Sequence, residues 1–198
     1  MMRKWLILFV AALLMVGVAG CSGGDNGSAE AEKSETEKSE GSAATENQEE
    51  AYIKFPEFES TTIAGDSIDA SIFTEAEVTM VNILGTFCGH CINEMPDLAE
   101  LYGELPEGCA LVGVLTDVYT DENLGIVNLD TANQIVTETG VNYDNIIPDE
   151  TLYQFLAENI TGVPTTLYVD SEGNILGGVV GARSKDEYKA ILEELVKE

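Results

Sequence analysis

Basic residues are scarce in this chain, which has 9 lysines and arginines against 36 aspartates and glutamates among 198 residues. The formal net charge is −27, and residues 52–198 alone carry 5 basic and 27 acidic side chains, a difference of −22. Nucleic-acid binding needs basic patches that neutralise phosphates, so this shortage excludes that class of function. Solubility or a salty habitat explains the acidity better than a specific cationic partner does.

The N-terminal part also lacks an apolar run long enough to cross a membrane. Its uncharged apolar stretch, residues 5–20, has 16 residues, whereas a membrane-spanning helix needs about 20. Arg3 and Lys4 precede this stretch and Cys21 follows it, which is the arrangement of an export signal. The four residues ending at Cys21, VAGC, resemble a bacterial lipobox, in which the cysteine is lipidated and becomes the new N-terminus. An ordinary signal peptide and a short anchor helix are the alternatives.

Residues 22–51 contain no large apolar side chain. Such a segment cannot bury enough surface to offset the entropy lost on ordering. We therefore predict a lipoprotein signal peptide at residues 1–20, a lipidated cysteine and a disordered acidic tether at 21–51, and a single domain at 52–198. The domain would lie on the extracytoplasmic face of the cell membrane of a Gram-positive bacterium.

Short apolar runs alternate with helical patterns in residues 52–198, which indicates an α/β sheet. The pattern predicts strands at 78–84, 109–116, 165–170 and 174–180, the last two forming a hairpin. It predicts helices at 91–102, 128–139, 151–158 and 184–196, the last opening with a capping box of Ser184 and Glu187. A small hairpin is predicted between Phe55 and Phe73, turning at residues 64–66.

Cysteine and histidine are too few for a structural metal centre. The cysteines are Cys21, Cys88, Cys91 and Cys109, and His90 is the one histidine. A structural zinc site needs four ligands. Cys21 belongs to the export signal, and Cys109 stands alone at the start of an apolar strand, where packing in the core is its expected role. We therefore expect no metal site.

The pair Cys88 and Cys91 falls where the first long strand passes into its helix. Haem attachment through CxxCH is excluded because residue 92 is isoleucine. A peroxiredoxin-like site is excluded because Val81 and Gly85 stand where that site needs proline and threonine. A purely structural disulfide would close so small a loop that it would stabilise little. We favour a redox-active pair and keep the structural disulfide as the alternative.

The N-terminus of a helix suits a reactive thiol, because unpaired N–H groups and the helix dipole favour the thiolate. At that position the pKa of Cys88 is expected to fall into the range of about 3.5 to 7.5 known for reactive CxxC thiols. Cys91, one turn further on, is more shielded and can attack a mixed disulfide formed at Cys88. An imidazolium at His90 would stabilise the thiolate further, unless His90 is only an exposed polar residue.

Two segments, VNILGTFCGHCINEMP and GVPTTLYVDSEGNI, resemble the thioredoxin superfamily, and in particular its membrane-anchored, extracytoplasmic TlpA/ResA-like thiol-disulfide oxidoreductases. The resemblance spans residues 55–198. It implies an α/β, thioredoxin-like fold with a central mixed β-sheet flanked by helices and an N-terminal β-hairpin extension. It also implies a redox-active Cys88–Cys91 disulfide, with no other cofactor.

The resemblance assigns further site residues. Pro164 would have a cis peptide bond and pack beside the disulfide, and Val163 would offer its backbone to a bound substrate chain. Glu94 matches a buried acid whose pKa desolvation would raise, which makes it a candidate proton exchanger for Cys91. A solvated glutamate in the first turn of the helix is the alternative. Asn82 stands where TlpA/ResA-like proteins commonly carry asparagine.

The segment around the cysteines also departs from this family. Leu84 and Phe87 stand where the family usually has tryptophans, and Gly89 and His90 are the pair found in protein disulfide isomerases. We predict a monomeric, lipid-anchored disulfide reductase kept reduced by a membrane electron donor of the CcdA/DsbD kind. Its substrates would be cysteine-containing exported proteins such as apocytochrome c or methionine sulfoxide reductase. A disulfide-forming oxidase or isomerase, and a non-catalytic binding lipoprotein, are the alternatives.

Overall fold

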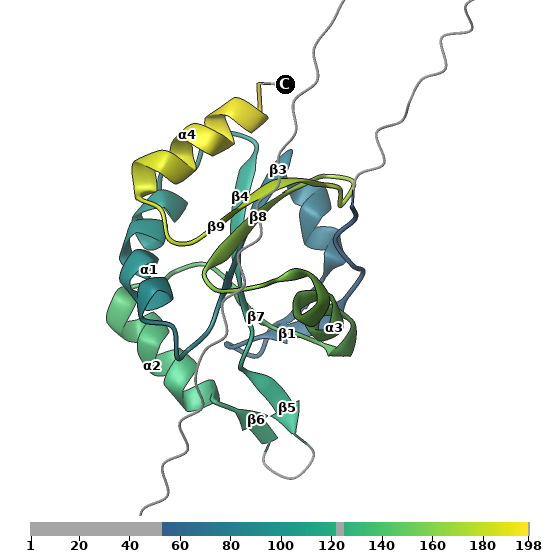
Figure 1. Cartoon of the computed structure of the whole chain (residues 1–198), viewed down its shortest axis with the longest axis vertical. Coiled ribbons are helices and arrows are strands. Elements are labelled where there is room, and N and C mark those ends of the chain that lie inside the picture. The colour runs from purple at the N-terminus through teal and green to yellow at the C-terminus, as the bar shows by residue number, and fades with distance from the viewer. Residues whose placement is uncertain (1–52, 122–124, 198) are drawn as a thin grey trace, which may run out of the picture. The chain divides into compact units, whose positions relative to one another are not determined.

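A mixed seven-stranded sheet forms the centre of the domain in the computed structural model, which describes residues 53–121 and 125–197. The strands follow the order β2-β1-β7-β4-β3-β8-β9. Strands β3, β4 and β7 run parallel, and β8, β9, β1 and β2 join through antiparallel pairs. The predicted fold class, a central mixed sheet flanked by helices, is therefore confirmed (Figure 1).

The elements follow the predicted order closely. The strands of the sheet are β1 (Glu59–Thr62), β2 (Ser67–Asp69), β3 (Val78–Leu84), β4 (Cys109–Leu115), β7 (Asn145–Ile147), β8 (Thr165–Asp170) and β9 (Ile175–Val180). The helices are η1 (Ala70–Glu75, a 3-10 helix), α1 (Gly89–Tyr102), α2 (Leu129–Thr139), α3 (Glu150–Asn159) and α4 (Lys185–Leu195). The predicted capping box at the start of α4 is present.

The sequence reading missed η1 and a second hairpin, β5 (Tyr119–Asp121) and β6 (Gly125–Val127). Each strand of that hairpin has three residues, which is too short to display an alternating pattern. The N-terminal hairpin was predicted, but its connection to the sheet was not. Strand β1 pairs with β7, so the hairpin extends the central sheet.

Helices cover both faces of the sheet. Figure 1 shows α1, α2 and α4 on one side of the central strands and α3 on the other. Side chains of β3 alternate between these faces, so that Met80 packs with Leu98 and Leu192 of the helical face formed by α1 and α4. Val81 packs instead with the cluster that contains Leu152 of α3. Both faces are buried, as the continuous apolar runs of β3 and β4 indicate.

The predicted signal peptide at residues 1–20, the lipidated Cys21 and the tether at 21–51 lie outside the described residues. Among residues 53–121 and 125–197, no helix has both the length and the apolar character needed to cross a membrane.

Candidate functional site

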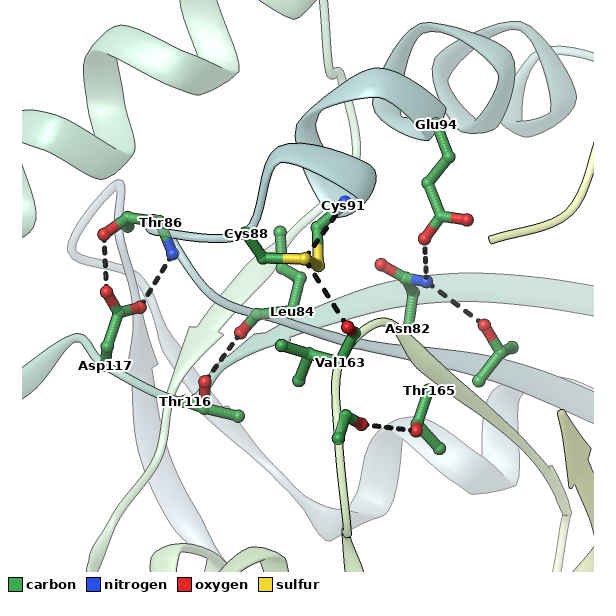
Figure 2. Close-up of a disulfide and its surroundings, with 12 residues drawn as sticks. Asn82, Leu84, Thr86, Cys88, Cys91, Glu94, Thr116, Asp117, Val163 and Thr165 are labelled. Atoms are coloured by element: carbon green, nitrogen blue, oxygen red, sulfur yellow. Dashed lines mark hydrogen bonds between the residues drawn. A yellow bond between two sulfur atoms is a disulfide. The ribbon is translucent and has the colours of Figure 1, made fainter. Parts of the chain in front are cut away.

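A disulfide joins Cys88 and Cys91 where β3 passes into α1. Cys88 is the N-cap of the helix, and the Cys91 N–H donates to its sulfur at 3.2 Å (Figure 2). The exposed fraction is 8% for Cys88 and 0% for Cys91. Both residues are therefore buried, but Cys88 keeps some exposure to solvent whereas Cys91 has none. This is the asymmetry that the sequence predicted for an attacking and a resolving thiol.

Residues at the end of β4 hold the loop that carries Cys88. The Thr116 hydroxyl donates to the Leu84 carbonyl oxygen at 3.1 Å. The Asp117 carboxylate accepts from the Thr86 N–H at 2.9 Å and also from the Thr86 hydroxyl (Figure 2). The sequence analysis did not single out Asp117, because its partner is 31 residues away and only the parallel pairing of β3 with β4 brings the two together.

Val163 and Pro164 lie against the disulfide. Their peptide bond is cis, as the resemblance implied. The Val163 carbonyl oxygen is 3.6 Å from the Cys88 sulfur (Figure 2), and Pro164 is buried. The Thr165 hydroxyl donates to the Gly162 carbonyl oxygen at 2.7 Å and so closes the turn that presents this segment. The half-buried backbone of Val163 thus borders the more exposed of the two sulfur atoms.

Glu94 of α1 is buried between the helix and the sheet, with an exposed fraction of 4%. Asn82 Nδ2 donates to Glu94 Oε1 at 3.1 Å, and the Tyr188 hydroxyl donates to Glu94 Oε2 at 3.0 Å. The Arg183 N–H lies 3.3 Å from the same Oε2 atom. Burial raises the pKa of Glu94, while these hydrogen bonds and the Arg183 charge oppose the rise. The structure therefore excludes the alternative of a solvated first-turn glutamate.

A row of polar residues crosses the sheet below α1. Asn145 of β7, Gly113 of β4, Asn82 of β3 and Thr166 of β8 occupy neighbouring register positions. Asn82 Nδ2 donates to Thr166 Oγ1 at 3.1 Å, whereas Asn82 Oδ1 and Asn145 Oδ1 are buried and have no hydrogen-bond partner within residues 53–121 and 125–197. The sequence analysis missed Thr166 and Asn145, since each follows or precedes apolar residues in a short strand and only the register aligns them.

The remaining candidates lie apart from the buried site. His90 is exposed on the first turn of α1. Cys109 is a free, half-buried cysteine that packs against the α1 and α4 cluster, and burial, followed by the charge of Glu77, raises the pKa of its thiol. Within the described residues, no cluster of histidine, cysteine and acidic side chains could hold a metal ion.

An apolar groove opens beside the disulfide. Phe87 is 72% exposed and Tyr153 of α3 is 47% exposed. Both side chains line the groove. The other lining residues come from α3, the loop after it and the end of β4, namely Leu156, Ala157, Ile160, Thr161, Gly162, Val163 and Thr116. The sequence analysis named Phe87 only as a departure from tryptophan. Its exposed ring now forms one wall of a groove whose other wall is α3.

Comparisons with known proteins agree on the family. The sequence model of the AhpC/TSA family matches residues 53–177. The thiol-disulfide oxidoreductase ResA of Halalkalibacterium halodurans is 27% identical over 132 residues, which cover 66% of this chain and 69% of ResA.

Solved structures show the same fold. A thioredoxin-family thiol:disulfide interchange protein of Chlorobium tepidum TLS superposes with a TM-score of 0.60 and 23% identity, covering 73% of this chain and 97% of that one. StoA of Bacillus subtilis superposes with a TM-score of 0.53 and 17% identity, covering 68% and 95%. The predicted resemblance to thioredoxin-fold thiol-disulfide oxidoreductases is therefore confirmed.

Proposed function

Because the chain belongs to the AhpC/TSA family and its relatives are thiol-disulfide oxidoreductases, we propose that it is a lipid-anchored, extracytoplasmic protein-disulfide reductase that acts through Cys88 and Cys91. The observation that carries the proposal is the placement of the disulfide. Cys88, at a helix N-terminus beside the Val163 carbonyl, keeps some exposure to solvent, and Cys91, one turn behind it, is fully buried. This is the arrangement that thiol-disulfide exchange through a mixed disulfide requires.

Reduction begins at the Cys88 thiolate. The Cys91 N–H and the N-terminus of α1 stabilise the negative charge on its sulfur. The thiolate attacks one sulfur of a substrate disulfide, so that a Cys88–substrate disulfide forms and the other substrate sulfur leaves as a thiolate. The Val163 backbone, 3.6 Å from the attacking sulfur, then borders the bound chain.

Resolution uses Cys91 and Glu94. The ionised Glu94 carboxylate takes the proton of the Cys91 thiol, which lies three residues earlier on the buried face of α1. The Cys91 thiolate attacks the Cys88 sulfur, and the substrate leaves with its second sulfur reduced. Two electrons have passed to the substrate, and the enzyme is left with the Cys88–Cys91 disulfide. A membrane electron donor of the CcdA/DsbD kind would return the pair to the dithiol.

The substrate is an exported polypeptide that contains cysteine. The groove between Phe87 and α3 is lined mainly by apolar side chains and lies next to Val163. A large apolar side chain near the substrate cysteine would bury its surface there, at about 25 cal/mol for each Å² removed from water. Apocytochrome c and methionine sulfoxide reductase are substrates of this kind.

The direction of electron flow follows from the reduction potential. A value near about −270 mV supports a reductase, and one near about −120 mV supports a disulfide-forming oxidase. The Gly89–His90 pair favours the oxidase or isomerase, because an imidazolium at the exposed His90 would stabilise the Cys88 thiolate. Equilibration of the protein with glutathione buffers, for the wild type and for His90→Ala, measures this potential directly.

Catalysis is tested by reduction of insulin with a dithiol as the electron donor. The wild type is expected to turn over, Cys88→Ala to be inactive, and Cys109→Ala to match the wild type because its thiol is remote from the disulfide. Iodoacetamide is expected to label Cys88 first after reduction. Absence of turnover together with absence of preferential labelling would support the binding lipoprotein instead.

Substrates and anchoring have separate tests. A Cys91→Ala variant cannot resolve the mixed disulfide, so it is expected to accumulate covalent adducts with exported proteins that mass spectrometry identifies. A Cys21→Ala variant is expected to lose membrane association, as fractionation would show. Retention of Cys21→Ala in the membrane would contradict the lipid anchor.

A further inference from the structure

Four buried side chains from four elements close a ring of hydrogen bonds under α1. Asn82 Nδ2 donates to Glu94 Oε1, as Figure 2 shows, and to Thr166 Oγ1, each at 3.1 Å. The Thr166 hydroxyl donates to the Tyr188 hydroxyl at 3.3 Å, and the Tyr188 hydroxyl donates to Glu94 Oε2 at 3.0 Å. The exposed fraction of all four residues is 4% or less. The donors and acceptors in this ring match an ionised Glu94.

The three groups that bond Glu94 differ in their chemistry. The groups that bond Glu94 are the Asn82 amide, the Arg183 N–H and the Tyr188 hydroxyl. An amide NH₂ and a backbone N–H can only donate, whereas a hydroxyl can both donate and accept. Since Asn82 presents its NH₂ to the carboxyl group, Tyr188 is the one of these three groups that can accept a hydrogen bond from protonated Glu94 without a change in side-chain position.

The proton transfer that the proposed mechanism needs makes this difference important. Glu94 passes through both protonation states each time it takes a proton from Cys91 and returns it to solvent. We propose that Tyr188 is a positioning residue that holds Glu94 in both states and thereby sets the pH range in which Glu94 accepts the Cys91 proton. This inference rests on the proposed function of Glu94.

The hydrogen bonds of the Thr166 and Tyr188 hydroxyls can reverse direction when Glu94 gains a proton. With Glu94 ionised, hydrogen bonds run from Thr166 to Tyr188 to Glu94. With Glu94 protonated at Oε2, its O–H donates to the Tyr188 oxygen, the Thr166 O–H turns away from Tyr188, and the Tyr188 O–H turns to a lone pair of Thr166 Oγ1. Only hydroxyl protons rotate, so the side chains keep their places through the catalytic cycle.

Several charged or titratable groups face Glu94 besides Tyr188. Cys91 lies on the same helix, and the Arg183 guanidinium approaches from the loop before α4 and favours the carboxylate. Tyr143, on the segment before β7, senses the Glu94 charge, and burial keeps its hydroxyl protonated by raising its pKa. Within the described residues, none of these side chains forms a hydrogen bond to the Glu94 carboxylate, whereas the Tyr188 hydroxyl does.

Removal of the Tyr188 hydroxyl has an asymmetric effect. Hydrogen bonds to an ionised group are roughly twice as strong as those between neutral groups. Tyr188→Phe therefore destabilises ionised Glu94 more than protonated Glu94, so that Glu94 stays protonated to a higher pH. The rate constant of the resolution step is expected to rise with pH as Glu94 ionises. This rising part of the pH profile, the acid limb, is expected to move to higher pH in Tyr188→Phe. The rate constant below that limb is expected to fall about tenfold, as a shift of one pH unit gives, with little change above it.

Resolution can be isolated with glutathione. The reduced full-length protein is mixed with oxidised glutathione between about pH 5 and about pH 9, quenched with acid and analysed by intact mass. Cys88 first forms a mixed disulfide and releases one glutathione thiolate, and Cys91 then displaces the second. Decay of the glutathione adduct reports the Cys91 step alone.

Tyr168→Phe is the matched control. Tyr168 is a buried tyrosine on the same face of the sheet, and its hydroxyl has no hydrogen-bond partner among the described residues. Loss of the Tyr168 hydroxyl is expected to leave the acid limb of the resolution step at the same pH. Thr166→Val removes the bond to Tyr188 without removing a partner of Glu94 and is expected to give a smaller upward shift. It serves as the second variant if Tyr188→Phe proves unstable.

A Glu94→Gln variant separates the inference from its premise. It is expected to abolish the acid limb, and addition of Tyr188→Phe is then expected to have no further effect on the pH profile. If Glu94→Gln removes the limb while Tyr188→Phe and Thr166→Val leave it unmoved, the role of Tyr188 is refuted and the proposed function stands. If Glu94→Gln itself leaves the profile unchanged, the proton role of Glu94 is wrong and the inference falls with it.

Discussion

The two faces of the central sheet differ in what they bury. The face under α3 and η1 contains an aromatic cluster in which the Phe55 ring packs against Phe58, Phe73 and Phe155, with ring centroids 5.1 to 6.2 Å apart. The face under α1 and α4 contains the disulfide, Glu94 and, among the described residues, four of the five buried polar atoms without a partner, on Asn82, Tyr143, Asn145 and Tyr168.

The two faces therefore differ in their contribution, one to the stability of the fold and the other to the candidate site. Burial of an unpaired polar group costs free energy, and a carboxyl whose pKa is raised by burial is destabilised in its ionised form. Natural proteins keep such departures from an apolar core mostly at functional sites. The α3 face supplies apolar packing that supports the fold, and the α1 face gives up part of that stability to bury Glu94 and other polar groups on the side of the sheet that carries the disulfide.

The largest expected effect on stability lies on the α3 face. Phe73 is 3% exposed and packs edge-on against Phe55 and Phe58 of the aromatic cluster. Phe73→Ala is expected to lower the free energy of unfolding by about 3 to 5 kcal/mol, measured by urea denaturation. The rate of insulin reduction per folded molecule is expected to stay unchanged. A smaller loss of stability with impaired chemistry would contradict the division between the faces.

Gly113→Ala probes the polar row on the other face. A Cβ at this position would collide with the Asn145 side chain and meet Leu84, so overpacking is expected to cost about 1 to 3 kcal/mol in unfolding free energy. Asn145→Ala is expected to reduce that cost in the double variant. Gly177→Ala on β9 is the control, because a Cβ there meets no atom within 4 Å. Equal losses at the two glycines would show that no close approach exists at Gly113.

Glu94→Gln is expected to change how the free energy of unfolding depends on pH, because it removes the buried carboxyl group. Since the pKa of Glu94 is raised in the folded state, the native protein binds more protons than the unfolded chain between the ordinary and the raised pKa. Wild-type stability therefore falls as the pH rises through that window, and glutamine lacks this fall. The stability of Glu94→Gln relative to the wild type is expected to increase with pH by about 1.4 kcal/mol for each unit of pKa shift.

Thermal unfolding from about pH 4 to about pH 8 would measure this relative stability. Glu100→Gln is the control, since Glu100 is an exposed residue paired with Lys185. A relative stability of Glu94→Gln that stays constant across this range would show that the folded state does not raise the Glu94 pKa.

The smallest expected effect is that of Tyr168→Phe. The Tyr168 hydroxyl is buried and has no partner in the part of the chain that the structure describes, so its removal is expected to change the free energy of unfolding by about 0 to 1 kcal/mol, in the stabilising direction. Tyr188→Phe, which removes a satisfied hydroxyl, is expected to destabilise by about 1 to 2 kcal/mol. Calorimetry on the two variants compares them directly, and equal effects would mean that the ring around Glu94 contributes nothing.

Local patterns predicted most of the elements. The apolar run of Val78–Leu84 is β3 residue for residue, and the capping box at Ser184 begins α4. The hairpin of β5 and β6 was missed because strands of three residues carry no period. Tyr188 lies within the predicted helix at 184–196, but helical periodicity does not show where a hydroxyl at the tip of a buried ring finds its partner.

The sequence by itself determined that a cysteine pair follows a buried strand at the start of a helix, because periodicity, caps and spacing are local properties. It also pointed to Glu94 through a resemblance. Only the tertiary structure decided that Glu94 is buried and that Asn82, Thr166 and Tyr188 surround it. These residues are up to 106 positions apart in the chain, and hydrogen bonds between them depend on strand register and helix packing, which no local pattern encodes.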